Sequence, residues 1–156
     1  MNASAARERT AQDIMTREPV CVELGMTIRQ VARIFDENEI SGTPVIDAEG
    51  RVVGVVSRTD LVKRYTDGDS DYDPRMLVEL FATFDEEEPS DVSGPLVTVD
   101  DFMTADPITA SPGTSIRTLA AEMVENRVHR IVIIDRERMP VGIVTSLDLV
   151  KALATA

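Results

Sequence analysis

The fold is decided by Gly54-Val-Val-Ser57-Arg58-Thr-Asp60-Leu-Val-Lys63, which returns as Gly142-Ile-Val-Thr145-Ser-Leu-Asp148-Leu-Val-Lys151. Each copy has the pattern of an apolar strand end, a hydroxyl-bearing turn and the first turn of a helix. The backbone N–H groups at a helix start lack partners within the helix and carry partial positive charge, so an anion can bind there. The Ser57 or Thr145 hydroxyl can add a hydrogen bond. The carboxylate of Asp60 or Asp148 can accept two hydrogen bonds from a ribose diol.

A single copy of this pattern has a second interpretation. Ser/Thr-x-x-Asp at a helix start is also an ordinary helix-capping arrangement, in which hydroxyl and carboxylate bind the backbone of their own turn.

The repetition extends far beyond the motif. Residues 13–63 align without a gap on residues 101–151, a shift of 88 positions, and 20 of these 51 positions are identical. We therefore divide the chain into an N-terminal segment (1–12), a first repeat (13–66), an acidic spacer (67–100) and a second repeat (101–156).

Each repeat reads as β-α-β-β-α, so we expect a mixed α/β (α+β) fold. In the first repeat Thr27 is a plausible N-cap, and Asn38 closes that helix. Ser115 caps the equivalent helix of the second repeat. The inner strands are apolar at nearly every residue, which indicates sheets buried on both faces. The strands are expected at 20–22, 43–46, 52–56, after Pro107, 131–134 and 141–144, and the last helix of each repeat begins near Thr59 and Leu147.

The composition argues against a secreted protein, a membrane protein and a nucleic-acid-binding protein. One cysteine, Cys21, cannot form an internal disulfide, and no signal peptide or membrane-spanning run is present, so we expect a cytoplasmic protein without a membrane partner. The net charge is −12, of which residues 64–100 carry −9, with eleven acidic and two basic residues. Because nucleic-acid binding needs a basic surface, it is not expected.

The spacer holds one further element. Pro74 and the apolar spacing that follows predict a helix over 74–84. The alternating aspartates of 67–73 do not match a calcium loop, so we interpret them as a solvated loop.

The motifs, in their order, resemble a tandem pair of CBS (cystathionine β-synthase) domains, also called a Bateman module. The resemblance is carried by Asp-Ile-Met-Thr (13–16), Ile-Ser-Gly-Thr-Pro-Val-Ile-Asp (40–47) and the opening motif, and by their counterparts at 101–104, 128–135 and 142–149. It implies two repeats packed sheet to sheet around pseudo-two-fold clefts, and a disc-like homodimer. The implied ligand is AMP, ADP or ATP, with S-adenosylmethionine or NAD as alternatives.

The resemblance also implies site residues. Asp60 and Asp148 would hold ribose hydroxyls, Ser57 and Thr145 would reach ribose or phosphate, and His129, Arg130 and Arg58 would face phosphate. The adenine slot would be lined by Cys21, Val22, Thr43, Pro44, Thr109, Ala110, Ile131 and Val132. The first repeat has Ser41-Gly42 in place of His-Arg, and the second has no proline matching Pro44, so the two clefts are unequal. Two of these residues have plainer interpretations: His129 as a strand-end histidine and Cys21 as a small buried apolar residue.

We therefore interpret the chain as a regulatory, energy-sensing module without catalytic activity, which acts through an unknown partner protein. No nucleophile–base pair or metal-ligand cluster is visible. Two alternatives remain, a structural dimerisation module with empty clefts and, less favoured, a nucleotide hydrolase.

Overall fold

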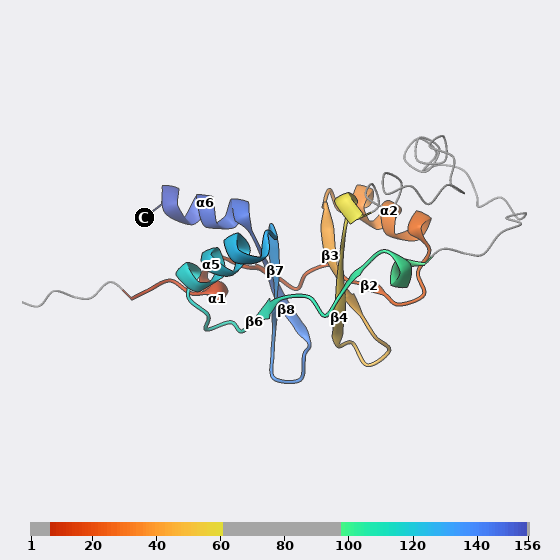
Figure 1. Cartoon of the computed structure of the whole chain (residues 1–156), viewed down its shortest axis with the longest axis horizontal. Coiled ribbons are helices and arrows are strands. Elements are labelled where there is room, and N and C mark those ends of the chain that lie inside the picture. The colour runs from red at the N-terminus through yellow and green to blue at the C-terminus, as the bar shows by residue number, and fades with distance from the viewer. Residues whose placement is uncertain (1–6, 61–97, 156) are drawn as a thin grey trace, which may run out of the picture. The chain divides into compact units, whose positions relative to one another are not determined.

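Two four-stranded sheets organise the protein in this computed structural model, which describes residues 7–60 and 98–155 (Figure 1). They belong to two compact units. Unit 1 takes the described parts of residues 1–19, 50–52 and 107–156, and unit 2 those of 20–49 and 53–106. The mixed α+β class predicted from the sequence is confirmed.

The sheet of unit 2 has the order β2-β3-β4-β5. Strand β2 (Val22–Glu23) runs parallel to β3 (Gly42–Ile46), because helix α2 (Ile28–Glu37) carries the chain back between them. Strand β4 (Val52–Ser57) follows β3 across a tight turn. Strand β5 (Thr104–Ala105) closes the sheet, antiparallel to β4.

The sheet of unit 1 repeats this plan as β6-β7-β8-β1. Strand β6 (Thr109–Ala110), helix α5 (Ile116–Asn126) and strand β7 (Arg130–Ile134) form the parallel crossover. Strand β8 (Pro140–Thr145) leads into helix α6 (Ser146–Ala154), and β1 (Thr16–Arg17) pairs with β8 from the N-terminal side of the chain.

The helices begin at the predicted caps. Thr27 Oγ1 accepts a hydrogen bond from the Gln30 backbone N–H at 3.2 Å, and Ser115 Oγ accepts one from Thr118 N at 3.1 Å. These bonds satisfy orphan N–H groups of the first turn. Asn38 is the C-cap of α2, as the sequence predicts.

The sequence repeats and the compact units are different divisions of the chain. The short helix α1 (Ala11–Ile14) spans the start of the first repeat but packs with the second. Ala11 N donates to the Thr114 carbonyl at 2.8 Å, and Val99 N donates to the Met26 carbonyl at 2.7 Å in unit 2. These two bonds are related by the same shift of 88 residues. Residues 7–19 therefore belong to the unit of the second repeat and residues 98–106 to the unit of the first, and we call these two stretches the exchanged segments.

Buried side chains show the same exchange. Ala11 is fully buried in the core of unit 1, and Val99, in the 3-10 turn η1 (Val99–Asp101), is 1% exposed in the core of unit 2. Thus Val99, which falls in the predicted spacer (67–100), completes a hydrophobic core.

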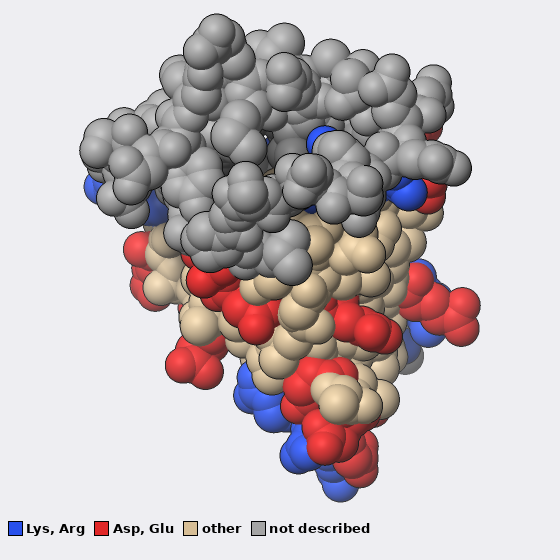
Figure 2. Space-filling view, turned by 90° about the vertical axis from the view of Figure 1, so that its right-hand side faces the viewer, with Lys and Arg blue, Asp and Glu red and all other residues tan. Residues whose placement is uncertain are grey.

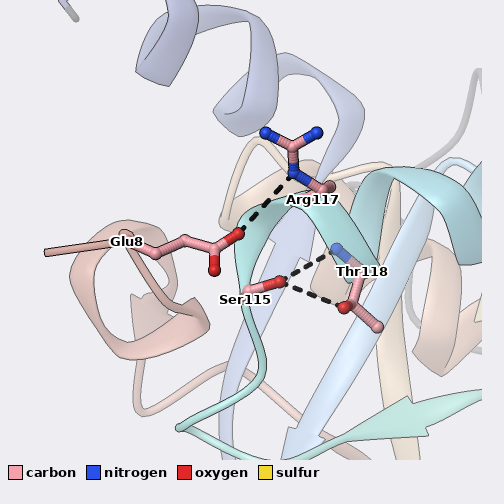
Figure 3. A network of polar contacts seen from close by, with 4 residues as sticks. All are labelled: Glu8, Ser115, Arg117 and Thr118. Atoms are coloured by element: carbon pink, nitrogen blue, oxygen red, sulfur yellow. Dashed lines mark hydrogen bonds and ion pairs between the residues drawn. The ribbon is translucent and has the colours of Figure 1, made fainter. Parts of the chain in front are cut away.

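Polar contacts also hold the N-terminal segment in place. Glu8 Oε1 lies 3.8 Å from Nε of Arg117, which is in the first turn of the helix that Ser115 caps (Figure 3). Both side chains are largely exposed, so this ion pair contributes little to stability. Arg9 Nη1 donates to the Ala152 carbonyl at 3.0 Å, and thereby satisfies an orphan C=O in the last turn of α6.

In each unit a glycine of the sheet packs against a methionine of the exchanged segment. A Cβ placed on Gly142 of β8 would lie 2.8 Å from Cγ of Met15, and one on Gly54 of β4 would lie 3.1 Å from Cγ of Met103. Only a residue without a side chain lets the methionine lie against the strand. This packing explains why the motif begins with glycine in both copies.

The burial of the strands agrees only in part with the prediction. Three successive residues are buried in β3 and in β7, so both faces of these strands are covered. Strands β4 and β8 instead alternate between more and less buried positions. The expected helix over 74–84, the rest of the acidic spacer and all but the first turn of the helix near Thr59 lie outside the described residues.

Candidate functional site

The Asp148 carboxylate closes the turn between β8 and α6. Its Oδ2 accepts hydrogen bonds from Thr145 N at 2.8 Å and from Thr145 Oγ1 at 3.0 Å, and the Asp148 N–H lies 3.3 Å from Thr145 Oγ1. This is a reciprocal capping box. The structure therefore confirms that the motif caps its helix.

The first repeat has the same geometry. Asp60 Oδ2 accepts from Ser57 N at 2.7 Å and from Ser57 Oγ at 3.1 Å. Both aspartates are only partly buried. Within residues 7–60 and 98–155, the second oxygen of each, Oδ1, accepts no hydrogen bond. An ionised carboxylate can accept about four hydrogen bonds, so the capping box leaves capacity for a ligand.

The start of each motif's helix is held by the backbone of the residue that precedes the neighbouring strand, β7 or β3. Ser146 N donates to the His129 carbonyl at 2.9 Å, and Arg58 N donates to the Ser41 carbonyl at 3.0 Å. Arg130 also stands opposite Thr145 in the β7–β8 register. Unit 1 thus brings His129, Arg130, Thr145 and Asp148 together at one end of its sheet. His129 is exposed, and the contact it makes in the described part of the chain is the backbone hydrogen bond to Ser146.

Five of the predicted adenine-slot residues are buried. Val22 and Ile131 belong to the two hydrophobic cores and are at most 1% exposed. Thr43 is fully buried, and its hydroxyl donates to the Val20 carbonyl. Pro44 and Val132 are buried too. These side chains are buried in the structure, and their role in lining an adenine slot stays a prediction.

The remaining slot residues are more accessible. Thr109 and Ala110 are half-buried in β6, beside Val132 and Ile133 of β7. Cys21 is half-buried just before β2, and burial raises the pKa of its thiol to about 11. A thiol with so high a pKa stays protonated at neutral pH and is a poor nucleophile.

A cavity of about 180 Å³ in unit 1 was not foreseen from the sequence. It is lined by residues of the N-terminal segment and of one face of α6, namely Arg9, Asp13, Ile14, Asp148, Lys151, Ala152 and Thr155. The signal for the α6 face was present, because Lys151 follows Asp148 by three residues and therefore shares its side of the helix. No local pattern could place Arg9 there.

The described surface carries charges of both signs. On the face shown in Figure 2, Asp and Glu side chains lie among Lys and Arg side chains, without a broad basic patch on the part drawn in colour. Among the described residues no group of three or more His, Cys, Asp or Glu side chains is arranged to hold a metal ion. None of the described helices is long and apolar enough to cross a membrane.

Comparison with known proteins identifies the family. The model of the CBS domain matches residues 11–67 and 99–155, so it covers more than half of the chain. The uncharacterized protein MJ1426 of Methanocaldococcus jannaschii is 36% identical over 91% of this chain and 89% of its own length. Other relatives are longer, and the chain spans only 22% to 55% of them.

Solved structures share the fold. The CBS domain pair of protein MJ0100, in complex with 5′-methylthioadenosine and S-adenosyl-L-methionine, matches with a TM-score of 0.72 at 22% identity, over 95% of this chain and 98% of that one. CBSX2 of Arabidopsis thaliana, in complex with AMP, matches with a TM-score of 0.70 at 24% identity, over 94% of this chain and 96% of that one. The chain therefore belongs to the CBS domain family and contains two CBS domains.

Proposed function

We propose that the chain is a regulatory module that binds an adenosine-containing ligand through the carboxylates of Asp148 and Asp60. The observation that carries the proposal is the unused Oδ1 of each aspartate, on a carboxylate whose position is fixed by its capping box. A preorganised acceptor loses little conformational entropy when a ribose diol binds. The adenosine compounds bound to structurally similar CBS pairs support this ligand class.

The two repeats offer unequal sites. Asp148 has His129 and Arg130 beside it, whereas the matching positions near Asp60 are Ser41 and Gly42. Cations favour phosphate, so we expect AMP, ADP or ATP at the Asp148 site, with S-adenosylmethionine or NAD as alternatives. We expect no catalytic activity, and the output passes to a partner protein.

A homodimer is part of the same proposal. Leu147, Val150 and Leu153 are 58%, 58% and 74% exposed along α6, at a spacing that places them on one side of the helix. Exposed apolar residues gathered in this way are typical of a protein interface. Light scattering should give about twice the chain mass of 17.1 kDa; a monomer at high micromolar concentration would refute this part.

One observation favours the structural alternative. Both carboxylates already serve helix caps, so the motif needs no ligand to account for it. A thermal-shift panel with AMP, ADP, ATP, NAD and S-adenosylmethionine separates the two functions. A ligand at 100 times its dissociation constant adds about 2.7 kcal/mol to the free energy of unfolding. Stabilisation by at least one compound supports the sensor; no response to any of them, and no ligand retained on purification, supports the structural module.

A further inference from the structure

The cavity beside Asp148 is lined by two cations, and one of them, Arg9, acts electrostatically on Asp13 of the same cavity. Arg9 uses Nη1 for the Ala152 carbonyl at 3.0 Å and Thr155 Oγ1 at 3.3 Å. A guanidinium has five N–H donors in all, so others remain for a ligand. The Lys151 ammonium donates no hydrogen bond to the described residues.

The two carboxylates of the same cavity are differently placed. Asp13 Oδ2 accepts from Thr10 N at 2.8 Å and from Thr10 Oγ1 at 3.1 Å, and Asp148 Oδ2 is held in the same way by Thr145. Each negative charge is therefore partly compensated by backbone and hydroxyl donors at a helix start. Arg9 is partly compensated by the Ala152 carbonyl and by Asp13, whereas the Lys151 ammonium donates no hydrogen bond to the described residues and can bind an added anionic group.

The size of the cavity indicates what that group is. Sites for whole small molecules have volumes of roughly 300–1,000 Å³, whereas this cavity measures about 180 Å³. It suits one end of a ligand rather than a complete nucleotide. Asp148, Lys151 and Thr155 follow one another along a single face of α6, so a ligand whose ribose is held at Asp148 can extend an anionic end toward Lys151.

We propose that Arg9 and Lys151 bind an anionic group, a phosphate or a carboxylate, attached to the 5′ side of the ribose held by Asp148. This inference rests on the proposed function and adds a specificity determinant to it. It also gives the N-terminal segment a role, because Arg9 reaches the site from outside the sequence repeats. The module would thus distinguish charged adenosine compounds from uncharged ones.

The test compares ligands that differ in the anionic group. Isothermal titration calorimetry measures AMP against adenosine, which lacks only the phosphate, and S-adenosylmethionine against 5′-methylthioadenosine, which lacks the carboxylate together with the ammonium and the sulfonium charge. The variants are Lys151→Gln, its conservative counterpart Lys151→Arg, and Arg136→Gln as a matched control. Arg136 is an exposed cation in the same unit and does not line the cavity. Because Lys151 is exposed and makes no described side-chain bond, its replacement should leave the fold intact.

We expect Lys151→Gln to weaken the charged member of the bound pair by about tenfold, the effect of one charge-assisted hydrogen bond. The uncharged member should bind as before, and Lys151→Arg and Arg136→Gln should keep the wild-type preference. The pair that responds identifies the anion as phosphate or carboxylate. An unchanged preference in Lys151→Gln, or an equal loss for both members, would overturn the inference while leaving the proposed function standing. If the wild type binds none of the four compounds, this inference fails; if it binds none of ADP, ATP and NAD either, the proposed function fails with it.

Discussion

Replacing Gly142 by alanine should destabilise the protein, because its new methyl group would collide with Met15. The added Cβ would lie 2.8 Å from Cγ and 3.1 Å from Cβ of that residue. These atoms are near the backbone of the exchanged segment and cannot swing away as a side-chain terminus would. Overpacking of this kind costs about 1–3 kcal/mol. Urea denaturation of the wild type and the variant measures the loss directly.

A double-mutant cycle isolates the contact. Met15→Ala removes the colliding atoms, so Gly142→Ala should cost much less in that background, with a coupling of about 0.5–3 kcal/mol. Gly113→Ala is the matched control, since a Cβ there meets nothing within 4 Å, and it should change stability by less than about 0.5 kcal/mol. Additive effects of Met15→Ala and Gly142→Ala would show that the exchanged segment does not pack on β8 as described.

Three further predictions follow from named contacts. Deletion of residues 2–13 should remove amide-exchange protection from β7 and β8 more than from β3 and β4, because Ala11 is buried in unit 1; equal loss in all four strands would contradict the exchange. At pH 8 Cys21, with a pKa of about 11, should be about one part in a thousand thiolate and react slowly with a disulfide reagent in the folded state; rapid labelling without unfolding would be inconsistent with its burial. Hydrogen bonds from the Thr10 backbone and hydroxyl lower the pKa of Asp13 below 3.8, so its contribution to stability is present above about pH 4 and lost as pH falls through the lower native value; Asp13→Asn should flatten that acid-side decline in urea midpoints, and an unchanged profile would refute it.

Local structure was predictable because its causes are local. The caps at Thr27 and Ser115 and the strand–turn–helix motif each depend on residues within a few positions, and the structure has them where the sequence places them. The repeat made the family resemblance specific, and the two CBS domains confirm it.

The exchange of segments between the units was not predictable from one sequence. Thr10 pairs with Ser115 and Thr27 with Thr98, but a period of 88 residues fits equally well with segments that pack on their own repeat. Only tertiary packing decides between the two arrangements. For the same reason the sequence gives no sign that the N-terminal segment packs on the second repeat, and Arg9 is not among the predicted site residues.

The motif itself was predictable in form but ambiguous in role. Ser57 with Asp60, and Thr145 with Asp148, form capping boxes, and the same carboxylate retains an unused oxygen. Capping and ligand binding are alternative interpretations of the sequence motif, whereas the geometry permits both at once. A stability measurement alone therefore cannot separate them, since Asp148→Ala loses the cap, at a cost of about 0.5–2 kcal/mol, in either case.

The measurement that tests the ribose site most directly is the affinity of AMP and of 2′-deoxy-AMP for the wild type and for Asp148→Ala. If Asp148 holds the ribose diol, the wild type should bind the deoxy compound about ten- to hundredfold more weakly than AMP. The variant should bind both compounds weakly and nearly equally, because the missing hydroxyl no longer has a partner. The same preference in the wild type and in the variant would contradict the account and leave Asp148 with a capping role alone.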